Sequence, residues 1–158
     1  MEKTAGEALK EKLFKTKTNG WDEASEEERS EIFKFSNEYI YFLNKSKKER
    51  EAVETTKGIL IKNDFKDIEE MDELNPGDKV YYVNRDKSIY MAVIGNKPIE
   101  DGLNIIGSHI DSPRLDLKPN PLYEDTDFAM LKTHYYGGIK KYQWTAIPLA
   151  IHGVIVKS

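Results

Sequence analysis

A histidine and an aspartate stand two residues apart in the part of this sequence that is richest in reactive side chains. All three histidines lie in the last 50 residues, and the first of them, His109, follows an apolar run and precedes Asp111. Imidazole is a common Zn²⁺ ligand, and a nearby carboxylate either binds the metal or holds another group by a hydrogen bond. Side chains two residues apart in an extended segment share a face, and Pro113 restricts the chain behind them. The spacing therefore predicts His109 as a metal ligand with Asp111 beside it.

The same tripeptide also fits a purely structural role, because a histidine beside a strand is often an ordinary core or surface residue that binds no metal. Other chemistries are excluded more firmly. There is no cysteine, so thiol nucleophiles and cysteine zinc sites are impossible. No nucleophile elbow or glycine-rich phosphate loop is present, and Ser108, His109 and Asp111 are too close in sequence to form a catalytic triad. We expect a structural role for His134 and a core or interface position for His152.

Composition restricts the class of protein. The 158 residues suffice for one domain or for part of a larger one, with 39% hydrophobic and 33% charged residues. Twenty-four Lys and Arg against 28 Asp and Glu give a net charge of −4, which argues against nucleic acid or an anionic membrane as a partner. No apolar run is long enough to span a bilayer, and the N-terminus lacks an apolar signal core. A cytoplasmic protein is expected.

The elements that must position the pair differ between the two parts of the chain. Residues 1–58 are dense in Lys and Glu and predict helices. Two capping-box pairs predict helix starts there, Ser25 with Glu28 and Ser46 with Glu49, and the second helix should run to Lys57 with Gly58 as its C′ residue.

Residues 59–158 should be mainly strands and loops. The predicted strands are 80–83 and 88–94, paired as a hairpin, then 103–110, 128–134 and 149–156. The third would deliver His109 at its carboxyl end, where α/β folds bind ligands. The expected fold class is α/β or α+β, with the helices before the strands.

Longer stretches of the sequence resemble the motifs of a known protein family. The run from Ile106 to Pro119, IGSHIDSPRLDLKP, resembles the signature of the aspartyl aminopeptidase and aminopeptidase I family of dizinc metallopeptidases. Residues 133–139 followed by 153–157 are similar to the family's next block, and residues 52–58 and 65–67 also fit. The resemblance covers nearly the whole chain.

The resemblance implies roles for two residues. His109 matches the family's first metal-binding histidine, and Asp111 matches the acidic residue that orients the catalytic glutamate. The other ligands of the two zinc ions and the general-base glutamate come from much later in such chains. The resemblance thus implies that residues 1–158 are the N-terminal part of the catalytic domain, with the rest of that domain and the dimerisation domain absent.

The implied activity is that of a hydrolase, a zinc aminopeptidase that removes N-terminal residues from peptides through a metal-activated water. The full-length protein would form a homo-oligomer, and this chain alone would be inactive. Residues 140–144 lack the pattern of the animal enzymes and look bacterial, which leaves the preferred N-terminal residue open. The alternative is a non-catalytic α+β binding or assembly module that keeps part of this fold. Coding sequence continuing past Ser158 would favour the enzyme.

Overall fold

The fold is α/β, as predicted: helices come first and two small sheets follow. The structure is a computed structural model that describes residues 4–15 and 17–157. It divides into two compact units, Met1–Tyr41 and Phe42–Ser158, and each is considered by itself. Within the described ranges, no helix combines the length and the apolar character needed to cross a membrane.

The first unit is helical. It contains α1 (Ala5–Leu13), α2 (Gly20–Glu23) and most of α3 (Glu26–Lys45). The capping box predicted before α3 is confirmed, since the Ser25 N–H donates to Glu28 Oε2 at 2.7 Å and the Glu28 N–H donates to Ser25 Oγ at 3.2 Å.

The second unit opens with α4 (Glu49–Lys62), where two expectations are wrong. Lys48 is the N-cap, without a side-chain cap bond, while Ser46 is buried and its hydroxyl has no partner among the described residues. The helix also continues through Gly58. The apolar residues that follow extend its packing face, and Leu60 is buried. Tertiary packing therefore outweighs the local tendency of glycine to end a helix.

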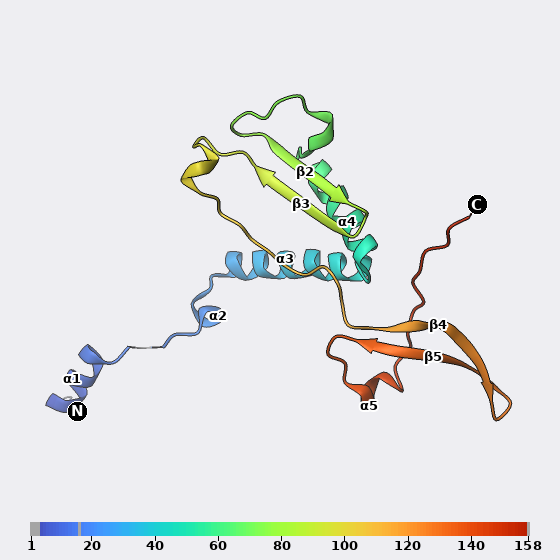
Figure 1. Cartoon of the computed structure of the whole chain (residues 1–158). Helices are drawn as coiled ribbons and strands as arrows, with labels where there is room; N and C mark the ends of the chain where they lie inside the picture. The colour runs from blue at the N-terminus through green and yellow to red at the C-terminus, as the bar shows by residue number, and fades with distance from the viewer. Residues whose placement is uncertain (1–3, 16, 158) are drawn as a thin grey trace. The chain divides into compact units, whose positions relative to one another are not determined.

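A three-stranded sheet packs against α4. It consists of β1 (Lys66–Asp67), β2 (Lys79–Asn84) and β3 (Ser88–Val93), in the order β1-β2-β3. The pair β1–β2 is parallel, and β2–β3 is the predicted antiparallel hairpin (Figure 1). Helix α4 contacts β3. In the part of the chain that the structure describes, the buried apolar side chains come from α4 and β2: Ala52, Val53, Leu60, Val80 and Tyr81. There are also two short 3₁₀ turns: Ile68–Glu70 lies between β1 and β2, and Ile99–Asp101 follows β3.

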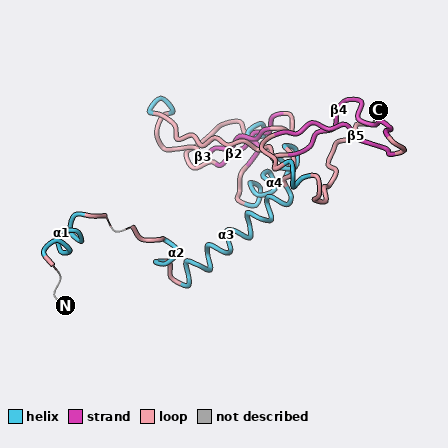
Figure 2. The backbone as a smooth tube through the Cα atoms, turned by 90° about the horizontal axis from the view of Figure 1, so that it is seen from below, coloured by secondary structure: helices cyan, strands magenta, loops and turns pink. Residues whose placement is uncertain are grey.

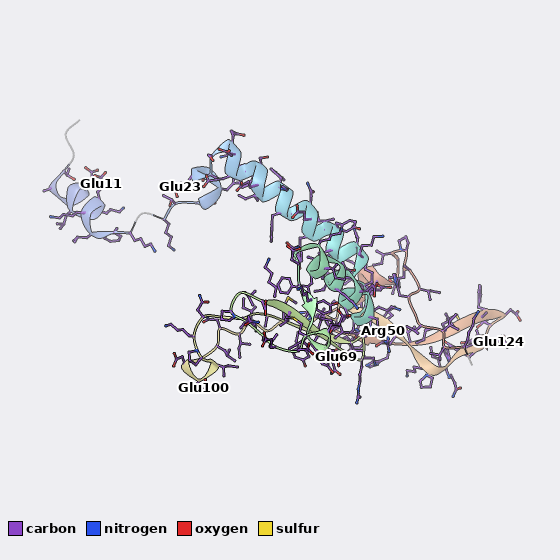
Figure 3. All side chains as sticks on the ribbon, turned by 90° about the horizontal axis from the view of Figure 1, so that it is seen from above. Glu11, Glu23, Arg50, Glu69, Glu100 and Glu124 are labelled. Atoms are coloured by element: carbon purple, nitrogen blue, oxygen red, sulfur yellow. The ribbon has the colours of Figure 1, made fainter. Side chains whose placement is uncertain are left out.

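A long two-stranded ribbon follows. Strands β4 (Arg114–Asp125) and β5 (Phe128–Tyr136) lie side by side (Figure 2) and pair antiparallel. The short helix α5 (Lys141–Trp144) comes after them (Figure 1). The turn between the strands places Thr126 and Asp127 at φ of 53° and 63°, the left-handed geometry of a tight hairpin. Glu124, labelled in Figure 3, lies near the tip of this ribbon.

Strand β4 is absent from the sequence prediction, and its prolines explain why. Proline cannot donate to a ladder, so two prolines within twelve residues argue against a strand. Pro119 and Pro121 fall inside the register shift between Leu117 and Leu122, where regular pairing is interrupted. The strand therefore accommodates both prolines at an irregularity.

Two predicted strands, 103–110 and 149–156, are wrong: both segments lie outside any ladder. Their sequences favour extended structure, but a strand also needs a neighbour to receive its hydrogen bonds. No described segment pairs with either one. Most of their apolar side chains are exposed to solvent, with Ile106 98% exposed and Ile155 88% exposed.

Candidate metal centre

His109 and Asp111 lie together, as their spacing predicts, although they are on a loop and not at a strand end. The Nδ1 atom of His109 is 2.9 Å from the main-chain oxygen of Asp111 and 3.2 Å from its Oδ1. A carbonyl oxygen can only accept a hydrogen bond, so Nδ1 carries the proton and Nε2 keeps its lone pair. Metal-binding histidines are held in this way, with one ring nitrogen donating to a carbonyl or carboxylate. The ring therefore fits a zinc ligand that binds through Nε2.

The Asp111 carboxylate is held in its ionised form. A hydrogen bond from the Tyr136 hydroxyl is the main cause of a lowered Asp111 pKa, and burial, which acts in the opposite direction, does not cancel it. The Asp111 N–H and the neighbouring His109 lower this pKa further. The same bond to Asp111 raises the pKa of Tyr136. The carboxylate is thus an acceptor shared between Tyr136 and His109.

The end of β5 fits closely against the turn that carries Asp111. Gly137 follows Tyr136 and has φ of +74°, where an L side chain is strained. A Cβ at Gly137 would also lie 3.3 Å from the Cα of Pro113. Glycine thus allows the end of β5 to lie directly against the turn that carries Asp111.

Arg114, the first residue of β4, joins several elements beside this turn. Its Nε is 2.8 Å from Asp116 Oδ1, and its Nη2 is 3.2 Å from Glu49 Oε1 at the start of α4. Its guanidinium carbon lies 4.3 Å from the centroid of the Tyr136 ring. The bond to Asp116 is the main cause of a raised Arg114 pKa.

The other two histidines have different surroundings. His134 lies in β5 and stacks on Tyr135, with 5.4 Å between ring centroids. His152, expected in a core or interface strand, instead lies on a loop and is exposed, with its Nδ1 2.8 Å from Glu51 Oε1. A second bond, from Lys48 Nζ to the Gly153 oxygen at 2.8 Å, ties the same loop to the start of α4.

The donor set is incomplete for a catalytic zinc ion. In the described part of the chain, no three His, Asp or Glu side chains are grouped closely enough to hold a metal. A catalytic zinc generally has three protein ligands. His109 and Asp111 are residue types that zinc accepts, so they fit part of such a site.

Sequence reasoning missed Tyr136, Gly137 and Arg114 as members of the site. Arg114 lies inside the motif that carries the resemblance, but its partner Glu49 is 65 positions away. The sequence signal that could have found them is the glycine directly after Tyr136 at the end of a strand, because glycine permits another backbone segment, here at Pro113, to come close.

Comparison with known proteins agrees with this picture. The family model described as aminopeptidase I zinc metalloprotease (M18) matches residues 42–158. A relative from Clostridium acetobutylicum, "Probable M18 family aminopeptidase 1", is 50% identical over 149 residues, which is 92% of this chain and 32% of the relative. One from Borrelia garinii, with the same name, is 52% identical over 139 residues, which is 88% of this chain and 30% of the relative.

Solved structures match as well. The crystal structure of aminopeptidase I from Borrelia burgdorferi B31 has a TM-score of 0.76 at 49% identity, covering 80% of this chain and 31% of that one. Aminopeptidase I from C. acetobutylicum has the same TM-score and identity, covering 92% and 33%. The chain thus spans about a third of the length of the relatives it matches. With the match over residues 42–158, the chain belongs to the aminopeptidase I family of zinc metalloproteases, M18.

Proposed function

We propose that this chain supplies the first zinc ligand, His109, and the neighbouring Asp111 to a metalloaminopeptidase that removes N-terminal residues from peptides. The observation that carries the proposal is the His109 ring held through Nδ1 by Asp111, which leaves Nε2 for a metal. The family and the names of its relatives support the reaction class.

The remaining machinery is proposed to lie outside these 158 residues. The chain spans about a third of its relatives' length, and the described residues provide fewer than three grouped ligands. We place residues 1–158 in the N-terminal part of the catalytic domain, with 1–58 mainly helical and 59–158 mainly strands and loops. The whole protein is proposed to hold two zinc ions, to form homo-oligomers and to act in the cytoplasm.

Each residue then has a distinct task. Zinc, when bound, polarises the scissile carbonyl and acidifies a water molecule. His109 would hold the metal through Nε2, while the Asp111 main-chain oxygen and carboxylate keep its ring oriented. The ionised Asp111 carboxylate is also proposed to orient the glutamate that accepts the water's proton and passes it to the leaving amine. Tyr136 is proposed to hold that carboxylate, since its hydroxyl is the main cause of the lowered Asp111 pKa.

One observation favours a second function, a non-catalytic binding or assembly module. The absence of a three-ligand group among the described residues means that these residues alone do not hold a catalytic metal. The two functions differ in the complete gene product, whose length is read from the coding sequence after codon 158. The enzyme requires further carboxylates and a late histidine there, and the module does not.

The deciding experiment compares the wild-type complete gene product with its His109→Ala variant. The wild type should hydrolyse aminoacyl anilides in the presence of Zn²⁺. The variant should lose one metal ion per chain, measured by elemental analysis, and nearly all turnover. His134→Ala is the matched control and should keep both metal ions. A His109→Ala protein with full metal content and near-normal turnover would refute the ligand role, and a wild type without turnover would favour the module.

A further inference from the structure

Arg114 connects three elements through one planar group. Its guanidinium is ion-paired with Asp116 in its own strand and with Glu49 in the first turn of α4, and it donates from Nη1 to the Ser112 oxygen at 3.4 Å. The face of the same group covers the Tyr136 ring, its partner across the β4–β5 ladder. With its side chain 27% exposed, Arg114 is only partly screened by water.

These contacts use properties that lysine lacks. A guanidinium offers donors in a rigid plane and stacks on aromatic rings while its edges bond carboxylates. The two carboxylates hold the edges at 2.8 and 3.2 Å, so the plane has a defined orientation over Tyr136. A lysine ammonium could pair with Glu49 or Asp116 but could not also present a flat face to the ring.

The consequence reaches the metal motif through Tyr136. The phenol ring is fixed on one face by Arg114, and its main chain is fixed by the close fit of Gly137 on Pro113. The hydroxyl of that ring is the main cause of the lowered Asp111 pKa, and Asp111 Oδ1 is 3.2 Å from His109 Nδ1. Arg114 also reaches this turn directly, because its Nη1 donates to the Ser112 oxygen, next to Asp111, at 3.4 Å. Arg114 therefore contacts both the Tyr136 ring and the turn that carries Asp111, and Asp111 in turn contacts His109.

We propose that Arg114 is a positioning residue of the zinc site: tied to Glu49 and Asp116, it fixes the Tyr136 ring so that its hydroxyl holds Asp111 against His109. The inference rests on the proposed function, because it gives Arg114 a part in that same site. A purely structural Arg114 would only attach the ribbon to α4. The two roles differ in whether loss of Arg114 and loss of the Tyr136 hydroxyl act on the metal through one path.

The test uses the complete gene product and four variants: Arg114→Gln, Arg114→Lys, Tyr136→Phe and the double variant Arg114→Lys/Tyr136→Phe. Each single variant should lower kcat about 10- to 100-fold with KM unchanged, the size typical of groups that orient a metal ligand. Each should also alter the visible spectrum of the Co²⁺-substituted protein and weaken Zn²⁺ in competition with a chelating dye. The double variant should be no worse than either single one, because both changes break the same path.

Arg50→Gln is the matched control. Arg50, labelled in Figure 3, lies in the same first turn of α4, and its Nη1 is 3.2 Å from Asp86 Oδ2 in the β2–β3 turn. The change removes a guanidinium–carboxylate pair from the same helix without touching Tyr136. The Co²⁺ spectrum and kcat of this control should match those of the wild type.

Three outcomes overturn the inference. One is an Arg114→Lys or Tyr136→Phe protein with an unchanged Co²⁺ spectrum and kcat. Another is a double variant whose losses are the product of the single ones, and the third is an Arg50→Gln control as impaired as Arg114→Gln. If Arg114→Gln does not fold, Arg114→Lys and Tyr136→Phe still decide. Failure of the proposed function looks different, because the wild type itself would then lack metal-dependent turnover and His109→Ala would change no metal content.

Discussion

His109 lies on a loop with its side chain 83% exposed, so neither a strand nor a core holds its ring. Its ring contacts Asp111, and the Tyr136 hydroxyl is the main cause of the lowered pKa of that carboxylate. At the scale of single residues, the candidate site is therefore a series of hydrogen bonds in which each group orients the next. Such a series is sensitive to changes that keep shape and alter charge.

Asp111→Asn keeps the shape of the side chain and removes its charge. The amide keeps the size of the side chain but loses the charge that the Tyr136 hydroxyl and the His109 ring stabilise. In the complete gene product, turnover should fall about 10- to 100-fold while most of the metal is retained. Activity against aminoacyl anilides and zinc per chain measure the two effects. Metal loss as complete as in His109→Ala would instead make Asp111 a direct ligand.

At the scale of elements, the first turn of α4 is the point to which distant segments attach. Glu49 pairs with Arg114 from the β4–β5 ribbon, and Glu51 pairs with His152 from the loop after α5. Both partners lie far away in sequence, yet they contact carboxylates two positions apart on one helix. The motif loop is therefore held in place by long-range polar contacts as well as by its own residues.

The Glu51–His152 pair predicts a pH dependence of stability. Burial raises the pKa of Glu51, but hydrogen bonds from His152 and the Lys47 N–H, with nearby positive charge, bring it below its ordinary value of 4.5. A lowered carboxylate pKa means that the unfolded chain binds the proton more tightly. The stabilisation is therefore complete above about pH 4.5 and lost as pH falls through the lower folded value.

Glu51→Gln removes this contribution. Thermal unfolding of the complete gene product should show a variant less stable than the wild type by about 0.5–1.5 kcal/mol at neutral pH. That difference should shrink as pH falls below 4.5. Glu54→Gln, an exposed change on the same helix, is the control and should show no such trend. A Glu51→Gln difference that grows on acidification would contradict the sign.

Gly137 provides a second test at this scale. Gly137→Ala places a Cβ at φ of +74° and 3.3 Å from the Pro113 Cα, so it should cost about 1–3 kcal/mol and displace the turn beside Asp111. The neighbouring Gly138→Ala meets no atom within 4 Å and is the control. Melting temperature and zinc content should fall for Gly137→Ala alone. Equal effects of the two changes would show that the contact with Pro113 is unimportant.

At the scale of the whole molecule, the described residues bury little apolar surface. Among the described residues, the buried apolar side chains are confined to α4 and β2, whereas Ile105, Ile151 and Val156 are at least 82% exposed. The sequence is long enough for a sizeable core, but its apolar segments lack neighbours among the described residues. Exposed β-prone segments of this kind tend to associate with other chains.

The 158-residue chain on its own should therefore lack aminopeptidase activity, bind zinc weakly and self-associate. Two candidate ligands do not meet the count that catalytic zinc requires, and the described residues add no third to the group. Hydrolysis of aminoacyl anilides with added Zn²⁺ or Co²⁺, metal stoichiometry and size-exclusion chromatography measure the three properties. Metal-dependent turnover from a preparation shown by mass to end at Ser158 would overturn the prediction.

The sequence alone determined the features that depend on near neighbours. The Ser25–Glu28 capping box, the β2–β3 hairpin and the approach of His109 to Asp111 each join residues a few positions apart. Interactions of such short range cost little chain entropy to form, so residue types and spacing are enough to predict them.

Only the tertiary structure decided what depends on distant partners. Glu49 and Arg114, and Glu51 and His152, meet because the fold brings them together. The segments 103–110 and 149–156 have strand-like sequences but form no ladder, since backbone groups need a partner strand that no pattern within the segment supplies. The motif residues could thus be found from sequence, while the groups that hold them in place could be identified only from the fold.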